Sequence, residues 1–576
     1  MRTGTRWWHP VVLIGLAAVV LASCTAKPPP TVSPEQAPAP PVSRSPEEIV
    51  IGVDDLTGGF NPHTLADLTP TGRAIAGLVL PSAFRQVPDG SWQLDRRLLS
   101  SARVTDTDPF TVTYRIRQDA AWSDTSPIAA EDFGYLAEQM RTQPGVIGSA
   151  GYQLIDEVVS RDGGKTVVVE FRAPYPGWRT LFRHLLPAHL LKDAPGGFAD
   201  ALDNSIPVSG GPFVLTSADP ARREVVLARN DRYWATPAKA DKLVFRDMPL
   251  RDLVEALGSG GVPAVLFGRP DATTIAVLDD AGVTERAVVP QPSVAHVLLR
   301  PAASPLEDER VRTAVAAALD RSSLIATGAA SGPSTDLVAD AQVLAPTQQG
   351  YEPTGPANGP PVQPDASTVV RMLTEAGYVR VPQGWERGGQ LLELVVAAPE
   401  NRDPYPTLAA RVAAQLTMYG IRVQVRTPSA DELFGTWLDD DSSRVTGRAA
   451  STGDDGPVHI AVVPQPAGAD PATVLASAHG CPLVTPAGVP MAPGNPAGVC
   501  DPLLQGVIAD ALTGTAPVDE VLSRVEPVLW ERMVSVPLYQ HTSVFVTGRG
   551  LDGVSPGPLL EGPLDGAARW QLRPAQ

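Results

Sequence analysis

The sequence lacks the short motifs that carry familiar catalytic chemistry. It contains no G-x-S-x-G elbow, no H-E-x-x-H pair, no P-loop and no G-x-G-x-x-G following a strand. Its eight histidines are scattered, and only His184 and His189 lie close together. A spacing of five does not place both on one face of a helix, so we interpret them as core or surface residues rather than metal ligands.

Positive charge and long apolar runs are also scarce. The chain has 46 Lys and Arg against 63 Asp and Glu, for a net charge of −17. Binding to nucleic acid depends on neutralising phosphates with Lys and Arg, so no nucleic-acid partner is expected. No stretch after the N-terminal region approaches 18 apolar residues, which predicts no further membrane span.

Two enzymatic alternatives stay open at this point. Asp439, Asp440 and Asp441 form an acidic run that could hold a divalent cation in a glycosyl transfer site, although such runs are usually solvated loops. A carboxylate pair for glycoside hydrolysis would be distant in sequence and leaves no local pattern. Neither has positive evidence, so we expect a protein that is not an enzyme and needs no cofactor or metal.

The N-terminal region predicts an exported lipoprotein. Arg2 and Arg6 precede an apolar run that closes on "LASC" at Cys24, which resembles a bacterial lipobox with Cys24 as the lipidated residue. An ordinary signal peptide with an incidental cysteine is the alternative. Residues 26–47 are rich in proline and serve either as an extended spacer or as a floppy leader. Removal of the signal, with its two arginines, would bring the net charge to −19.

The remaining cysteines, Cys481 and Cys500, predict a structural disulfide. Outside the cytoplasm such a pair is oxidised by default, and its spacing has no Cys-x-x-Cys character that would suggest a redox role. The two residues bracket a Pro- and Gly-rich segment with little regular structure to hold it. Closing a loop of this length contributes roughly 3 kcal/mol in the chain-entropy model.

Periodicity along the rest of the chain indicates an α/β protein. More than 500 residues follow position 48, too many for one hydrophobic core. Alternating patterns predict strands at 111–117, 165–172, 224–229 and 421–426, and 3.6-residue patterns predict helices at 307–325, 365–377 and 408–419. A helix that ends at Gly420 and leads into a strand is typical of α/β lobes.

Several sequence blocks resemble the family 5 extracellular solute-binding proteins, which include the peptide-binding receptors of ABC importers. The most specific is "TYRIRQDAAWSDTSPIAAEDF" from Thr113; "VSGGPFVL", "LARNDRYWATPAKADKLVFR", "DERVRTAVAAALDR" and "VPLYQ" follow in family order. The resemblance implies a periplasmic-binding-protein-like fold with two α/β lobes, a hinge and an extra subdomain. It also implies that Cys481 and Cys500 fall where many members carry a disulfide loop.

The predicted organisation follows from this resemblance and the N-terminal signal. We expect a signal peptide at 1–23, a lipidated linker at 24–47, lobe I at 48–91, 206–298 and 534–576, an extra subdomain at 92–205 and lobe II at 299–533. The chain would sit on the outer face of the cytoplasmic membrane, held by its acyl anchor.

Two departures from the family pattern bear on the turn geometry and on the ligand. Thr125 replaces the glycine of the Trp-Ser-Asp-Gly turn, so that turn is expected to differ slightly. Peptide binders of the family carry a Trp-x-x-Asp segment whose aspartate meets the peptide amino group; here the two positions fall near Pro464 and Ala467. A buried ammonium would lose its carboxylate, so free peptide N-termini are not the expected ligand.

The lipobox, the leader and the altered peptide site together resemble a mycobacterial lipoprotein branch of this family. That branch is linked to phosphatidylinositol mannosides on the way to lipomannan and lipoarabinomannan, and implies a membrane mannosyltransferase as a neighbour. Sugar recognition would need aromatic platforms, for which Trp385 and Trp437 are candidates, although either is more often a core residue. The alternative is an importer receptor that delivers peptides or another small solute to an ABC permease.

Overall fold

The computed structural model describes residues 47–439, 457–481, 483–484, 490–491 and 495–573. From Pro46 onward the chain forms one compact unit, and the account below concerns this unit. The predicted lipidation site at Cys24, the leader, Asp440 and Asp441 lie outside the described residues.

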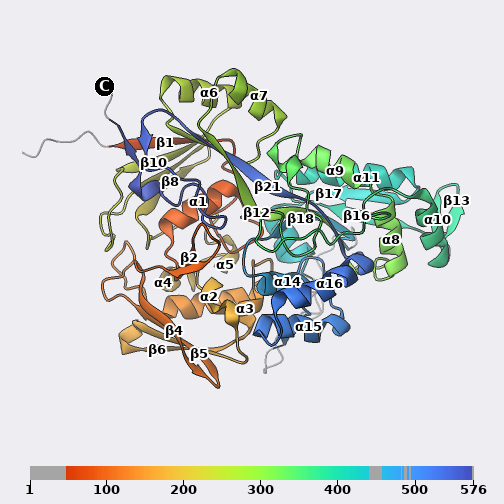
Figure 1. Ribbon diagram of the computed structural model, residues 1–576, viewed down its shortest axis with the longest axis horizontal. Helices are drawn as coiled ribbons and strands as arrows, with labels where there is room; N and C mark the ends of the chain where they lie inside the picture. The colour runs from red at the N-terminus through yellow and green to blue at the C-terminus, as the bar shows by residue number, and fades with distance from the viewer. Residues whose placement is uncertain (1–46, 440–456, 482, 485–489, 492–494, 574–576) are drawn as a thin grey trace, which may run out of the picture. The chain divides into compact units, whose positions relative to one another are not determined.

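A ten-stranded mixed sheet runs through the unit (Figure 1). Its strands, in spatial order, are β17 (Arg422–Arg426), β16 (Glu393–Ala397), β18 (Ile460–Pro466), β12 (Arg286–Leu299), β21 (Ser535–Thr547), β11 (Ala264–Phe267), β1 (Glu48–Val53), β10 (Lys242–Asp247), β9 (Glu224–Arg229) and β8 (Phe213–Asp219). The long central strands β12 and β21 are antiparallel and buried along most of their length, which explains their near-continuous apolar sequence.

The central ladder is interrupted where the chain passes between two hydrophobic cores. Pairing of β12 with β21 shifts register between Pro290 and Val294, so Gln291 and its neighbours leave the ladder. We call lobe I the part packed with β11, β1, β10, β9 and β8, and lobe II the part packed with β17, β16 and β18. Lobe I is held by one core around Ile51 and Phe245, and lobe II by others around Val297 and Leu475.

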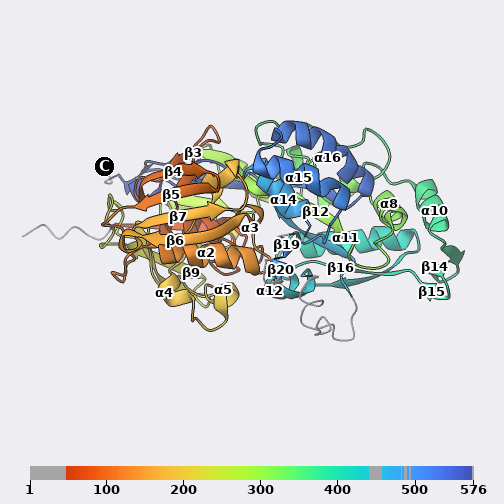
Figure 2. The ribbon, with the colours of Figure 1, turned by 90° about the horizontal axis from the view of Figure 1, so that it is seen from below.

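A second, four-stranded antiparallel sheet packs into the core of lobe I (Figure 2). Its order is β4 (Leu99–Thr107), β5 (Phe110–Ile116), β7 (Thr166–Phe171) and β6 (Ile155–Arg161), with α2 (Ala130–Thr142) alongside. Tyr114, Phe133 and Phe182 form an aromatic cluster beneath it, with ring centroids 4.8–5.7 Å apart. This sheet occupies the region predicted for the extra subdomain; the residue limits of that subdomain and of the lobes stay predictions.

Helices cover both lobes. Lobe I carries α1 (Pro70–Val79), α3 (Ala150–Gln153), α4 (Ala188–Leu191), α5 (Gly197–Asp200), α6 (Leu250–Ser259) and α7 (Ala272–Asp280). Lobe II carries α8 (Glu309–Ala317), α9 (Arg321–Gly328), α10 (Ala366–Glu375), α11 (Tyr405–Met418), α14 (Pro471–His479), α15 (Pro502–Thr513) and α16 (Val518–Arg532). Shorter elements that position the site are β2 (Phe84–Gln86), β3 (Trp92–Leu94) and the 3-10 turn η2 (Pro176–Thr180).

Most of the local predictions are confirmed. Strands β5, β7, β9 and β17 and helices α10 and α11 lie where periodicity placed them. Asp365 caps α10 by accepting from the backbone N–H groups of Ser367 and Thr368. The single helix predicted over 307–325 is wrong, because the chain forms α8 and α9 with a break at Ala318–Asp320. Asp320 starts the second helix as an N-cap, accepting from the N–H of Ser323.

The Trp-Ser-Asp turn contains Thr125 where the family has glycine; its difference from the family's turn stays a prediction. Thr125 has φ +82°, in the left-handed region that glycine favours, and its N–H donates to the carbonyl of Trp122. The backbone therefore keeps a glycine-like conformation although the residue is β-branched. Such a residue pays about 1–2 kcal/mol of steric strain at this φ.

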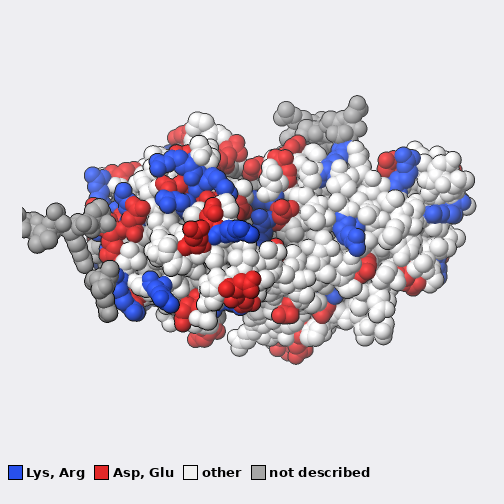
Figure 3. Space-filling view, turned by 90° about the horizontal axis from the view of Figure 1, so that it is seen from above, with Lys and Arg blue, Asp and Glu red and all other residues white. Residues whose placement is uncertain are grey.

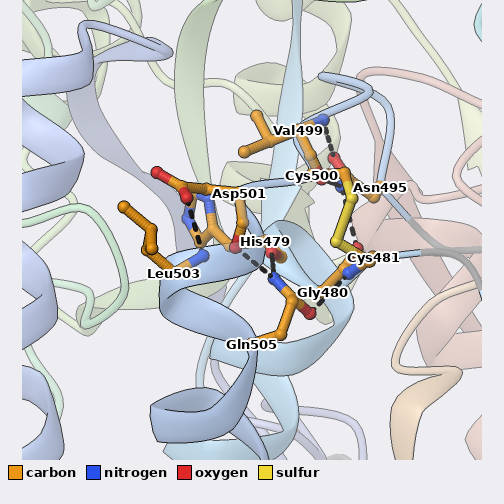
Figure 4. Close-up of a disulfide and its surroundings, with 9 residues drawn as sticks. All are labelled: His479, Gly480, Cys481, Asn495, Val499, Cys500, Asp501, Leu503 and Gln505. Atoms are coloured by element: carbon orange, nitrogen blue, oxygen red, sulfur yellow. Dashed lines mark hydrogen bonds between the residues drawn. A yellow bond between two sulfur atoms is a disulfide. The ribbon is translucent and has the colours of Figure 1, made fainter.

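Cys481 and Cys500 are joined by a disulfide with an Sγ–Sγ distance of 2.04 Å (Figure 4). The bond ties the end of α14 to the start of α15. Gln505 accepts from the N–H of Cys481 at 2.7 Å, and Asn495 donates to the carbonyl of Val499 at 2.6 Å. The pair that the sequence singled out thus anchors the two ends of the Pro- and Gly-rich segment between these helices.

Figure 3 shows the distribution of charged residues on one face of the molecule. Lys and Arg are interspersed there with Asp and Glu, and a large part of the lobe II surface is uncharged. Within the described residues, none of the helices has the length and apolar character needed to cross a bilayer.

Candidate functional site

Three cavities lie between lobe I and lobe II, and together they define the candidate site. The one we call the large cavity, about 780 Å³, opens beside β2, β3 and η2. The second, which we call the acidic cavity, has a volume of about 570 Å³ and opens beside the start of α11 and the end of β8. The third, the small cavity of about 70 Å³, lies at the register shift of β12 and shares Arg402 with the acidic cavity. The two greater volumes are in the range of small-molecule binding sites.

The large cavity is lined by groups suited to sugar hydroxyls. Trp92 contributes a half-buried ring, and the guanidinium of Arg183 lies 5.5 Å from the ring centroid on one side. The lining polar residues from both lobes are Gln86, Asp89, Arg179, Thr180, Thr347, Gln348, Gln349 and Asp470. Gln349 and Arg179 are exposed, so their donors are available to a ligand.

Several of these side chains are held in place by neighbours in the same wall. Gln348 accepts from the N–H of Ala345 at 2.9 Å and donates to the carbonyl of Ala469 at 3.3 Å. Asp470 caps α14, accepting from both the N–H and the hydroxyl of Thr473. The wall contributed by lobe II is therefore largely preorganised.

The acidic cavity is named for the seven Asp and Glu residues in its lining, which outnumber its two arginines. Asp67, Asp203 and Asp431 line it from three separate segments. Burial raises the pKa of Asp203 to about 6, and the charges of Asp431 and Asp67 add to the effect. Burial also raises the pKa of Asp67, against hydrogen bonds from the N–H groups of Gly59 and Asn61.

The small cavity carries three arginines, Arg73, Arg269 and Arg402. Arg269 lies 3.8 Å from the carboxylate of Asp55, and Arg402 donates to the backbone carbonyl of Ala66. His541 lines the same cavity and is hydrogen-bonded to the hydroxyl of Tyr405 at 2.8 Å.

Burial lowers the pKa of His541 to about 4. Its imidazole is neutral at neutral pH, so the positive charge of the small cavity comes from the guanidinium groups.

A buried ion network lies next to residues that line the small and the large cavity. Glu561 lies at its centre, 3.0 Å from Arg183 and 3.5 Å from Arg85. Burial by itself raises the pKa of Glu561, but the charges of the two arginines outweigh it and the pKa is lowered. Gln86 links the network to lobe II, because its amide donates to the carbonyl of Gly468 at 3.4 Å.

The two lobes touch across the cleft. Besides the contact of Gln86 with Gly468, the hydroxyl of Tyr175 meets that of Thr473 at 2.7 Å, and Arg402 of lobe II reaches the backbone of Ala66 in lobe I. These contacts define a closed arrangement of the kind that hinge proteins adopt around a ligand.

Ala467 stands where peptide binders of the family carry the aspartate that meets the peptide amino group. Ala467 is buried in a small apolar cluster with Val294, Ala339 and Ala345, so no carboxylate faces a ligand ammonium from this residue. The neighbouring residues 468–471 line the large cavity. This segment of the chain therefore does lie at the cleft.

The two tryptophans proposed as sugar platforms do not serve that purpose in this structure. Trp385 is 3% exposed in the lobe II core, and its indole N–H donates to the carbonyl of Tyr419. Trp437 is half-buried, donates to Glu432 and lines none of the three cavities. The tryptophan that lines the large cavity is Trp92, which the sequence analysis did not single out.

His184, His189 and Asp439 likewise lie outside the lining of the three cavities. His184 is buried with its backbone N–H bonded to Ser82, and His189 pairs with Asp124 at 2.8 Å. Asp439 is the described member of the acidic run and lines none of the three cavities. In the part of the chain that the structure describes, no group of three or more His, Cys, Asp or Glu side chains could hold a metal ion.

Sequence reasoning missed the cleft residues because their partners are distant along the chain. Arg73 meets the carbonyl of Leu560, which is 487 positions later, and Gln86 meets Gly468 after 382. No local periodicity reports such a pairing. The "PQP" of β12 at Pro290 was the one local signal, since prolines in a buried strand mark an interruption of the ladder.

Comparison with known proteins agrees with this architecture. Residues 93–457 match the model of bacterial extracellular solute-binding proteins, family 5. The chain is 37% identical over 640 aligned residues to the probable monoacyl phosphatidylinositol tetramannoside-binding protein LpqW of Mycobacterium tuberculosis, covering 97% of each chain. It is 28% identical over 468 residues to the oligopeptide-binding protein OppA of Mycobacterium bovis, covering 76% of each.

Solved structures share the fold. A periplasmic EDTA-binding protein, EppA, matches with a TM-score of 0.68 at 24% identity, covering 92% of this chain and 97% of its own. The oligopeptide-binding protein AppA of Bacillus subtilis, bound to a nonapeptide, matches with a TM-score of 0.69 at 15% identity, covering 92% and 100%. With these matches and its two lobes around a central cleft, the chain belongs to the family 5 extracellular solute-binding proteins.

Proposed function

We propose that this chain is a non-catalytic, membrane-anchored binding protein for phosphatidylinositol mannosides, which it directs in lipomannan and lipoarabinomannan biosynthesis. The observation that carries the proposal is the 37% identity, across 97% of both chains, to a protein named for binding a monoacyl phosphatidylinositol tetramannoside. The cleft residues supply an independent physical argument.

The lining of the large cavity fits a glycan better than a peptide. A partly buried indole with amides and carboxylates around it offers stacking to a sugar ring and paired donors and acceptors to its hydroxyls. Ala467 supplies no carboxylate at the position where peptide binders of the family carry one, and Asp470 of the same wall is engaged as the N-cap of α14. An unpaired buried ammonium costs several kcal/mol.

The position of the protein in the cell is part of the proposal. Lipidation at Cys24 would hold the chain on the outer face of the cytoplasmic membrane, where acyl chains contribute about 0.8 kcal/mol per buried methylene. A glycolipid could then be presented to a membrane mannosyltransferase beside it. This arrangement requires no chemistry from the protein itself.

The alternative is a receptor that delivers peptides or another small solute to an ABC permease. It is favoured by the 28% identity to a mycobacterial OppA over 76% of both chains. The closed cleft is compatible with either ligand, since both roles use the same hinge fold.

Native mass spectrometry of the full chain in detergent tests the proposal. The protein is mixed with purified phosphatidylinositol mannosides and, separately, with a defined mixture of tri- to pentapeptides. We expect the mannolipid to be retained and the peptides to be ignored. Trp92→Ala should weaken mannolipid binding by about tenfold or more, whereas Trp437→Ala, outside the cavities, should leave it unchanged. Retention of peptides alone would make the importer role correct.

A further inference from the structure

Arg73 is a cleft arginine with no carboxylate partner. It lies in the first turns of α1, is partly buried, and lines the small cavity at the register shift of β12. Its guanidinium donates to the carbonyl of Leu560 at 3.0 Å and, weakly, to the amide oxygen of Gln291 at 3.5 Å. Among the described residues no Asp or Glu oxygen lies within ion-pair distance of it.

The neighbouring charges leave Arg73 uncompensated. Asp95, Glu561 and Asp565 are matched by Arg85, Arg97 and Arg183, which lie in ion-pair contact with them. Arg73 is a fourth cation beside this balanced set, and it shares the carbonyl of Leu560 with Arg183. Burial, reinforced by the charge of Arg183, lowers the pKa of Arg73 to about 10, so the group stays charged at neutral pH.

The opposite wall of the small cavity adds positive charge. Arg402 and Arg269 line it, and Arg402 has no ion pair within the described residues. The lining carboxylates are Asp55, 3.8 Å from Arg269, and Asp403, so three arginines face two carboxylates. A partly buried cation without a partner is costly, and an anion of the right size relieves that cost. Guanidinium groups bind phosphate and carboxylate oxygens with directed, charge-assisted hydrogen bonds.

We propose that Arg73 binds a phosphate group of the ligand in this small cavity, with Arg402 on the facing wall. The inference rests on the proposed function in taking the cleft as the ligand site, and it deepens that function by placing the phosphodiester of the ligand. Sugar-bearing parts would extend into the large cavity.

The charge pattern of the cleft restricts the anion to this position. The acidic cavity is lined by Asp67, Asp203 and Asp431, which repel a phosphate. The large cavity offers Arg179, but that side chain is exposed and lies over the ring of Trp178, 4.4 Å from its centroid. The small cavity is the part of the described cleft where partly buried cations face a space without a matching number of carboxylates.

Binding measurements on the full chain in detergent test the proposal with four probes. They are a phosphatidylinositol mannoside, its deacylated glycerophospho form, an inositol oligomannoside without phosphate, and inorganic phosphate. We expect Arg73→Gln to weaken the two phosphodiester probes by about tenfold to hundredfold and to leave the neutral oligomannoside unchanged. Arg73→Lys should retain part of the affinity. Arg371→Gln, which removes an exposed arginine of α10, should change nothing.

The possible outcomes test the anion site and the proposed function independently of each other. Equal affinity of the wild-type protein for the phosphodiester and neutral probes would overturn the anion site while the mannoside function stands. Binding of inorganic phosphate that Arg73→Gln abolishes, without any mannolipid binding, would support the anion site and refute the function. Should Arg73→Gln fail to fold, as judged by its unfolding temperature, the wild-type probe comparison and Arg73→Lys still decide the question.

Discussion

Gly468 offers the most direct test of whether the lobes close on each other as described. It has φ +83°, lies in lobe II next to Ala467, and its carbonyl accepts from Gln86 of lobe I. A Cβ added there would lie 2.8 Å from Cδ2 of Leu559, which belongs to the C-terminal segment of lobe I, and 3.1 Å from Cβ of Pro292. Gly468→Ala therefore adds backbone strain and a steric conflict across the cleft.

The two costs can be separated with a matched control. Gly260, which ends α6, has φ +78° and no heavy atom within 4 Å of an added Cβ, so Gly260→Ala pays the backbone cost alone. That cost is about 1–2 kcal/mol. The conflict at Gly468 adds about 1 kcal/mol, the low end of the overpacking range, because the clashing atom is the end of a leucine side chain.

Chemical denaturation and small-angle X-ray scattering measure the two effects. We expect Gly468→Ala to lose about 2–3 kcal/mol of unfolding free energy and Gly260→Ala about 1–2 kcal/mol. Only Gly468→Ala should increase the radius of gyration, since opening the lobes relieves its conflict. Adding Leu559→Ala should recover about 1 kcal/mol relative to additivity. Equal losses of unfolding free energy for Gly468→Ala and Gly260→Ala, with no change in the radius of gyration, would refute the contact between Gly468 and Leu559.

Two further predictions concern stability. Thr125→Gly should raise the unfolding free energy by about 0.5–1 kcal/mol, because the relief of left-handed strain exceeds the entropy that glycine adds to the unfolded chain. The control, Thr374→Gly at an exposed position of α10, should lower the unfolding free energy. A lower unfolding free energy for Thr125→Gly would contradict the strain argument. Asp203→Asn should raise stability at pH 7 by less than about 1 kcal/mol after solvent screening. The pKa of Asp203 is raised from 3.8 to about 6, so the folded state holds the proton more tightly and stability falls as the pH rises from about 4 to 6. Thermal unfolding of Asp203→Asn and wild type should therefore converge near pH 4, and a constant gap down to that pH would contradict the assignment.

The sequence by itself determined the local structure and the family. Strands such as β9 and helices such as α10 follow from side-chain periodicity and from a cap at Asp365, both of which act over a few residues. The family motif around Trp122 can also be recognised from a short stretch of consecutive residues. At Asp320 two local signals competed. The apolar periodicity predicted one continuous helix, whereas the capping side chain of Asp320 starts a second helix there.

Only the tertiary structure decided the ligand site. Ala467 and Trp385 were read from their sequence context, yet the first is buried among small apolar residues and the second in the core of lobe II. Trp92, Arg73 and Gln86 contact groups far away along the chain, so their burial and charge balance exist only in the folded protein. Periodicity reports which face of an element is buried, whereas a cleft is formed by the ends of many elements that no local rule brings together.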